Sequence, residues 1–164
     1  MSEFRAFFQS MERAAKGDFR KEFELFLEGV GVDFLRVVQD EIERRKVLDS
    51  RLLLASFEKG GDGNVWELTD GGLTLEVGTN VEYATWVENG HTQEPGRFVP
   101  GYFQEKNGKD VFVYEPGAET GMVLKEKLVN GKHYFESALR IYDKIFRAEA
   151  EAKLQEWLDS YFGG

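Results

Sequence analysis

The stretch 135-FESALRIYDKIFRAEAEAKLQEWLDSY-161 decides the architecture, because apolar residues recur along it at helical spacing. Successive members of this stripe are three or four residues apart, as on one face of an α-helix. A helix of about 30 residues is roughly 45 Å long, so it would overhang a domain of this size. The stripe consists of Phe135, Leu139, Tyr142, Phe146, Ala150, Leu154, Trp157 and Tyr161. The sequence therefore predicts a long C-terminal helix, with Asn130 as a possible cap.

A second stripe predicts a long amphipathic helix from Asp18 to Lys46. Asp18 suits its N-cap, and Gly29 and Gly31 each cost about 1 kcal/mol relative to alanine, which favours a bend or a close contact there. The stripe consists of Phe19, Phe23, Phe26, Leu27, Val30, Phe34, Val37, Val38 and Ile42. The two ends of the chain are thus expected to be long helices.

The segment between these helices predicts hairpins. Ser50 to Phe57 is expected to be a short buried connection, and the glycines at 60–64 a turn. Alternating apolar and polar residues then predict a hairpin from Trp66 to Val77 with one buried face. Thr79 and Glu82 form a capping box that opens a short helix, which is expected to stop near Asn89 and Gly90.

A second hairpin follows, because Asn107-Gly108 is a strong two-residue turn signal between the extended stretches 102–105 and 110–115. Residues 122–129 are expected to be a further extended piece. The prediction is an α+β fold, in which a small, mostly antiparallel β-sheet packs against a long N-terminal helix and a long C-terminal helix, with a short helix in the middle. We expect a single domain over 1–164, made of an N-terminal aromatic arm (1–17) and a core (18–164).

Composition excludes several classes of protein. The chain of 164 residues has no cysteine, which excludes disulfides, thiolate catalysis and cysteine-ligated metal centres. No apolar run is long enough to span a membrane, and the N-terminus lacks the features of a secretory signal, so we expect a soluble cytosolic protein. The net charge is −9, and residues 51–130 hold 13 acidic and 7 basic side chains. Tight binding of nucleic acid is therefore not expected.

Candidates for catalytic chemistry are few. Glu88, His91 and Glu94 have the composition of an acid–base or metal cluster, but the predicted helix ends near Gly90, so the three need not share a face, and no HExxH-type pair fixes them. The favoured interpretation is a hydrated loop histidine between two solvated acids. His133 is expected to be an exposed residue in the first turn of the last helix and is not considered a ligand. No nucleophile motif and no phosphate-binding loop occurs, so we expect no enzyme, no cofactor and no metal.

Aromatic residues concentrate in 83-YATWVENGHTQEPGRFVPGYF-103 and in the arm. Tryptophan, tyrosine, phenylalanine and arginine are enriched in the cores of protein interfaces. The alternatives remain open: these side chains could roof the sheet, and the arm could pack on its own domain or on a neighbour. The candidate interface residues are Phe4, Phe7, Phe8, Tyr83, Trp86, Arg97, Phe98, Tyr102 and Phe103.

Three segments carry a family resemblance: VEYATWVENGH (81–91), the element from Arg97 to Gly101, and VNGKHYFESAL (129–139) at the start of the last helix. In their order and in the predicted elements around them, they resemble the tail-completion proteins of long-tailed phages. That family is typified by gene product ten of the lambdoid Hong Kong ninety-seven phage and is related to minor tail protein Z. The resemblance covers about residues 18–160. Thr92, the insert 102–121 and the aromatic arm depart from the family pattern.

The resemblance implies a structural virion protein of the neck, assembled in the host cytoplasm. It implies a ring, of six copies, that joins tail to capsid and contacts other neck or tail proteins. Phage DNA would be only a passing cargo in the channel, and no membrane or small-molecule substrate is implied. An acidic segment would suit such a channel, because it repels DNA. Two alternatives remain: a prophage-derived interaction module of the same fold, and a small hydrolase using His91 with Glu88 or Glu94.

Overall fold

The computed structural model describes residue 9, residues 18–47 and residues 51–162. The chain divides into two compact units. The first, here called the core unit, comprises residues 1–88 and 132–164, and the second, the strand unit, comprises residues 89–131. The α+β prediction is confirmed, although the strands form three small antiparallel sheets and no single one. The single-domain expectation stays a prediction.

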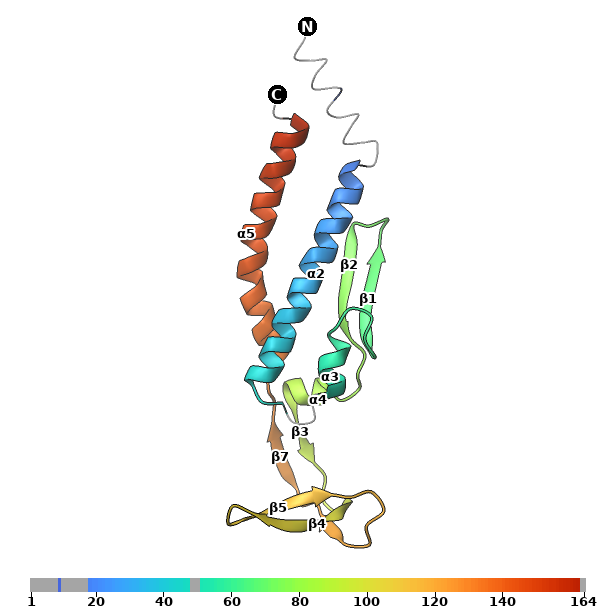
Figure 1. Ribbon diagram of the computed structural model, residues 1–164, viewed down its shortest axis with the longest axis vertical. Helices are drawn as coiled ribbons and strands as arrows, with labels where there is room; N and C mark the ends of the chain where they lie inside the picture. The colour runs from blue at the N-terminus through green and yellow to red at the C-terminus, as the bar shows by residue number, and fades with distance from the viewer. Residues whose placement is uncertain (1–8, 10–17, 48–50, 163–164) are drawn as a thin grey trace. The chain divides into compact units, whose positions relative to one another are not determined.

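The core unit is built on two long helices that lie side by side in Figure 1. Helix α2 (Asp18–Arg44) confirms the predicted N-terminal helix, and α5 (Tyr134–Phe162) confirms the C-terminal one. The shorter elements of this unit are α3 (Arg51–Ser56), β1 (Asn64–Thr69), β2 (Thr74–Thr79) and α4 (Ala84–Asn89).

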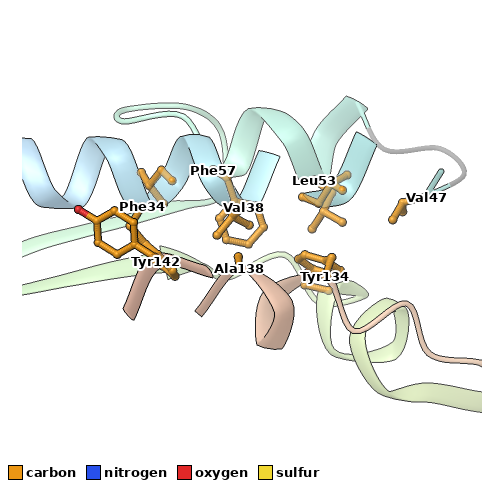
Figure 2. Close-up of a cluster of buried hydrophobic side chains, with 11 residues drawn as sticks. Phe34, Val38, Val47, Leu53, Phe57, Tyr134, Ala138 and Tyr142 are labelled. Carbon is orange, nitrogen blue, oxygen red and sulfur yellow. The ribbon is translucent and has the colours of Figure 1, made fainter. Parts of the chain in front are cut away.

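The hydrophobic core lies where α2 and α5 meet α3 and α4, and Figure 2 shows its side chains. Phe34 packs edge-on against Phe135, with ring centroids 5.6 Å apart, and Phe57 packs in the same way against Tyr134 at 6.0 Å. The predicted stripes supply four members of the cluster, Phe34, Val38, Ile42 and Tyr142. Its members are Phe34, Leu35, Val38, Ile42, Val47, Leu53, Phe57, Ala84, Tyr134, Ala138 and Tyr142.

A second contact joins the N-terminal part of α2 to the C-terminal part of α5. Trp157 of α5 packs against Phe19, Phe23 and Phe26 of α2, with centroid separations of 5.0, 5.8 and 5.7 Å. The Trp157 indole N–H donates to Glu22 at 2.9 Å, so the nearly buried ring keeps a hydrogen-bond partner. Aromatic side chains therefore pack between α2 and α5 at both ends of the helix pair.

Glu41 is a buried carboxylate near the end of α2. It accepts hydrogen bonds from Arg44 at 2.6 and 2.5 Å and from Arg45 at 3.1 Å. The hydrogen bonds from Arg44 lower the pKa of Glu41 from 4.5 to about 2, against the opposing effect of burial. Glu41 therefore stays ionised well below the pH at which an ordinary glutamate is protonated.

The predicted hairpin 66–77 is confirmed as β1 and β2, which pair from Asn64↔Thr79 to Thr69↔Thr74. β2 lies against α2, where the helix presents Gly31. A Cβ at Gly31 would be 2.7 Å from Leu75 and 2.8 Å from the Trp66 ring. The expected close contact at this glycine pair is thus made by Gly31 alone, because nothing lies within 4 Å of a Cβ at Gly29.

Three local expectations are refined or corrected. The short buried connection expected at 50–57 contains helix α3, in which Leu53 and Ser56, at helical spacing, both face the core. The extended piece 122–129 is two strands with a break between them. Asn130 does not cap α5, because it lies in a strand and the cap comes from elsewhere in the chain.

The strand unit contains two sheets. Strands β3 (Gly90–Gln93) and β7 (Lys127–Asn130) pair antiparallel, and a three-stranded sheet has the order β5-β4-β6. β4 (Phe98–Lys106) and β5 (Lys109–Tyr114) form the predicted hairpin, drawn in Figure 1. Its turn residues Asn107 and Gly108 both have positive φ, as a type I′ turn requires. β6 (Gly121–Val123) pairs with the start of β4.

Candidate interaction surfaces

The strand unit is rich in apolar side chains but has no hydrophobic core of its own. All of its residues are described, and none of its hydrophobic side chains is buried. A sheet that is uncovered on both faces gains little from the hydrophobic effect. Its large exposed apolar residues are Phe98, Tyr102, Phe103, Val111, Tyr114, Val123 and Leu128. Such a concentration makes the strand unit a candidate interaction surface.

The strand register divides the apolar residues of the three-stranded sheet between two faces. We call the face with Phe98, Tyr102, Val111, Val113 and Val123 the even face, after the numbers of its β4 residues. The odd face carries Val99, Phe103, Phe112, Tyr114 and Met122. Phe103 of the odd face is 59% exposed, and Val123 of the even face is 60% exposed. Both faces are therefore available for contacts.

Two glycines allow the tips of aromatic rings to come close to the backbone of this sheet. A Cβ at Gly101, whose φ is +152°, would be 2.6 Å from the Phe112 ring. A Cβ at Gly121 would be 2.6 Å from the Phe98 ring. The absence of a side chain at each glycine thus makes room for a ring on the same face of the sheet.

The predicted interface residues that the structure describes lie on or next to α4 and β4. Trp86 is 60% exposed on α4, whereas Tyr83 is half-buried and packs against the core cluster. Phe98, Tyr102 and Phe103 are all exposed on β4, and Arg97 is exposed just before it. Phe4, Phe7 and Phe8 lie outside the described residues. The interface assignment itself stays a prediction.

Sequence reasoning missed other exposed apolar residues. Val111 and Tyr114 of β5, Val123 of β6 and Leu128 of β7 were not singled out. The sequence 111-VFVY-114 contained a signal for this surface, because its apolar residues lie on both faces of the strand. No second layer covers this strand. Helix α5 also carries exposed apolar residues outside its predicted stripe, namely Ile141, Ile145 and Leu158.

Glu88 has a structural role that bears on the hydrolase interpretation. Its carboxylate accepts hydrogen bonds from the backbone N–H groups of Phe135 at 2.9 Å and Glu136 at 3.0 Å. These N–H groups are among those that the first turn of a helix leaves without intrahelical partners. Glu88 is therefore the N-terminal cap of α5. His91 lies in β3 opposite Val129, and Glu94 follows that strand.

Glu88, His133 and Glu136 form a cluster at the start of α5, with one potential ligand atom of each within 4.8 Å of the others. Such groups can bind a metal ion. However, both Glu88 oxygens already accept backbone N–H groups, and the positive end of the helix dipole disfavours a cation. Glu136 also pairs with Arg140, which lowers the pKa of Glu136. We assign this cluster to helix capping.

A groove of about 690 Å³ lies between α2 and α5. Leu25, Phe26 and Val30 provide its apolar part, and acidic side chains dominate its charge. The acids are Glu22, Asp33, Glu149 and Glu156, with Lys153 as the basic residue. The groove contains no histidine, so it does not supply the site that the hydrolase interpretation needs.

Comparisons with known proteins identify the family to which the chain belongs. The family model described as "Bacteriophage HK97-gp10, putative tail-component" matches residues 3–90. A relative from Bacillus subtilis (strain 168), Phage-like element PBSX protein XkdI, is 41% identical over 151 residues, which cover 91% of each chain. The chain belongs to the HK97-gp10-like family. A second relative of the same strain, Uncharacterized protein YqbI, is 40% identical over 163 residues, which cover 95% of each chain. No solved structure matches the chain.

Membership in the HK97-gp10-like family confirms the resemblance and makes the chain a phage structural protein. The expectation that the arm lies outside the family pattern is wrong, because the match begins at residue 3. The match ends at Gly90, so it covers α4 but not the three-stranded sheet. In the described part of this HK97-gp10-like chain, no helix has the length and apolar character needed to cross a membrane.

Proposed function

We propose that this HK97-gp10-like protein is a tail-completion protein that forms a ring in the neck of a tailed phage, where it joins tail to capsid. The observation that carries the proposal is the strand unit, whose apolar side chains have no core in the isolated chain. In a family of tail components, the covering surface would come from other virion proteins or from copies of the chain.

A ring requires two different contact surfaces on each subunit, because each copy binds its neighbour head to tail. The strand unit offers one surface, and Trp86 of α4 or the exposed residues of α5 offer another. Six copies are the stoichiometry that the family resemblance implies. The acidic excess in residues 51–130 would line a channel through which DNA slides without binding.

Deletion of the gene from its phage or phage-like element tests the proposal. If the protein joins tail to capsid, electron microscopy of the lysate is expected to show filled capsids and free tails that are not joined. Expression of the protein from a plasmid should restore joined particles. Joined particles in the deletion strain would overturn the neck assignment.

A second candidate is a prophage-derived interaction module with the same fold and a different partner. The relative XkdI favours it, because its name assigns that protein to a phage-like element. The two candidates differ in assembly. Light scattering of the purified chain at several concentrations, alone and with tail or neck proteins, is expected to show a ring for the first candidate and a monomer or binary complex for the second.

A further inference from the structure

The three-stranded sheet of the strand unit has two open edges, β5 and β6. We propose that β5 of one copy pairs in parallel with β6 of the next copy, so that the sheet continues from subunit to subunit. This inference rests on the proposed function, because it specifies how copies of the chain would bind one another in a ring. It commits to a second copy as the occupant of the β5 edge.

β5 lacks the features that protect an edge strand from pairing. Monomeric proteins protect such edges with proline, inward-pointing charges, bulges or a covering element. The register of β5 with β4 is unbroken from Lys109 to Tyr114, so no bulge interrupts it. Its central residues, 111-VFVY-114, contain no proline, glycine or charge. The strand is therefore suited to accept another strand along its free edge.

The hydrogen-bond pattern shows which backbone groups face each open edge. The N–H of Glu115 donates to the carbonyl of Pro100 at 3.2 Å, and bonded pairs alternate along an antiparallel ladder. The backbone groups of Phe112 and Tyr114 therefore point away from β4. On the other side, the N–H of Leu124 donates to the carbonyl of Arg97 at 2.8 Å. By the same alternation, Gly121 and Val123 point away from β4.

These alternations restrict the register between β5 and β6 of the next copy. In a parallel pair, an outward-pointing residue bonds to the residues before and after its neighbour on the other strand. Phe112 would then lie beside Met122 and bond to Gly121 and Val123. The same register puts Val113 beside Val123 on the even face and Tyr114 beside Leu124 on the odd face. The apolar faces of the two copies thus become continuous.

Charge complementarity selects this register from the others that satisfy the alternation. It places Lys109 beside Glu119 and Glu115 beside Lys125, and all four residues are exposed. A shift of the register by two residues in either direction takes the acidic neighbour away from Lys109, which then lies beside Gly117 or Gly121. These surface pairs would fix the register, while the apolar side chains supply most of the buried area.

The parallel direction agrees with a ring. β5 and β6 both run antiparallel to β4, so they are parallel to one another. A rotation about an axis along the strands brings β6 of one copy beside β5 of another in the parallel sense, and such head-to-tail contacts close into rings. A contact between two β5 strands would instead be antiparallel and would give a two-fold dimer.

Cysteine cross-linking tests the register directly, because the chain has no natural cysteine. The purified full-length variants Val113→Cys and Val123→Cys are mixed at a concentration where light scattering shows oligomers, and are then oxidised. We expect a cross-linked dimer from the mixture and a ladder of multimers from the double variant. The matched control is Val111→Cys with Val123→Cys, which is off register by two residues on the same face and should cross-link several-fold less.

A charge reversal provides the second measurement. Lys109→Glu should raise the concentration for half-maximal association about two- to fivefold, and Glu119→Lys in the same chain should restore it. An unchanged melting temperature shows that each variant is folded. Oligomers without preferential 113–123 cross-linking, or cross-linking by Val113→Cys alone, would overturn the pairing but leave the ring proposal standing. A chain that is monomeric up to about 1 mM, together with joined particles in the deletion strain, would overturn both.

Discussion

The carboxylate of Glu88 at the end of α4 binds the backbone N–H of Phe135 in the first turn of α5, 47 residues further along the chain. Two backbone hydrogen bonds reinforce this junction: the N–H of Lys132 donates to Val87 at 2.7 Å, and the N–H of His133 donates to Glu88 at 3.1 Å. Residues 89–131 therefore leave and re-enter the core unit at neighbouring points. The cap and these backbone hydrogen bonds hold the end of α4 against the start of α5.

Replacing Glu88 by alanine is expected to lower the free energy of unfolding by about 1–2 kcal/mol, because two N–H groups of α5 lose a charged acceptor near the helix N-terminus. Glu88→Gln keeps one acceptor oxygen and should lose less. Urea denaturation measures the difference, with Glu67→Ala, an exposed acid of β1, as the control. Equal stability of the Glu88→Ala and Glu67→Ala variants would contradict the capping role.

Gly29 and Gly31 of α2 are expected to respond in opposite directions to alanine. Gly29→Ala should stabilise the protein by about 1 kcal/mol, because nothing obstructs the new methyl group and alanine is the better helix former. Gly31→Ala should destabilise it by about 1 kcal/mol net, because the methyl group would press against Leu75 and the rigid Trp66 ring. Thermal denaturation compares the two. A Gly31→Ala variant as stable as Gly29→Ala would show that β1 and β2 do not pack on α2 as described.

Glu41 makes stability depend on pH. Its pKa is lowered from 4.5, the ordinary value of a glutamate, to about 2 in the folded chain, mainly by the Arg44 hydrogen bonds, so the contribution to stability is present above pH 4.5 and is lost as the pH falls toward 2. We expect about 1–2 kcal/mol, a value reduced for screening because the Arg44 side chain is 61% exposed. The free-energy difference between wild type and Glu41→Gln should shrink between pH 5 and pH 2.5. The exposed neighbour variant Asp40→Asn should show no comparable change.

The helices and hairpins could be predicted because their signals are local. The stripes of α2 and α5 repeat over many turns, and Asn107-Gly108 specifies a tight turn whatever surrounds it. Helix α3 could not be predicted as a helix from 50-SRLLLASF-57, because a short apolar run fits a buried strand, a loop or a helix equally well. Its helical form is decided by the core, against which it places Leu53 and Ser56.

The capping of α5 was beyond local reasoning. Asn130 is the residue type and position that a cap pattern favours, but it pairs with Gly90 in the β3–β7 ladder. Glu88 reaches the helix only because the fold brings α4 to its start. The exposure of Trp86, Phe98, Tyr102 and Phe103 agrees with their choice as candidate interface residues, but the pattern of residues 83–103 did not point to the apolar edge strand β5.

The exposed aromatic residues of β4 allow the contribution of each face of the sheet to self-association to be tested separately. Tyr102→Ser removes an aromatic ring from the even face and Phe103→Ser removes one from the odd face, and truncation of an aromatic side chain at an interface centre costs about 1–2 kcal/mol or more. We expect at least one of them to weaken self-association about tenfold, as measured by light scattering over a concentration series. Leu73→Ser is the matched control, because Leu73 is 50% exposed in the core unit. Loss of association by the Leu73 variant alone would place the contact on the β1–β2 hairpin and contradict the role of the strand unit.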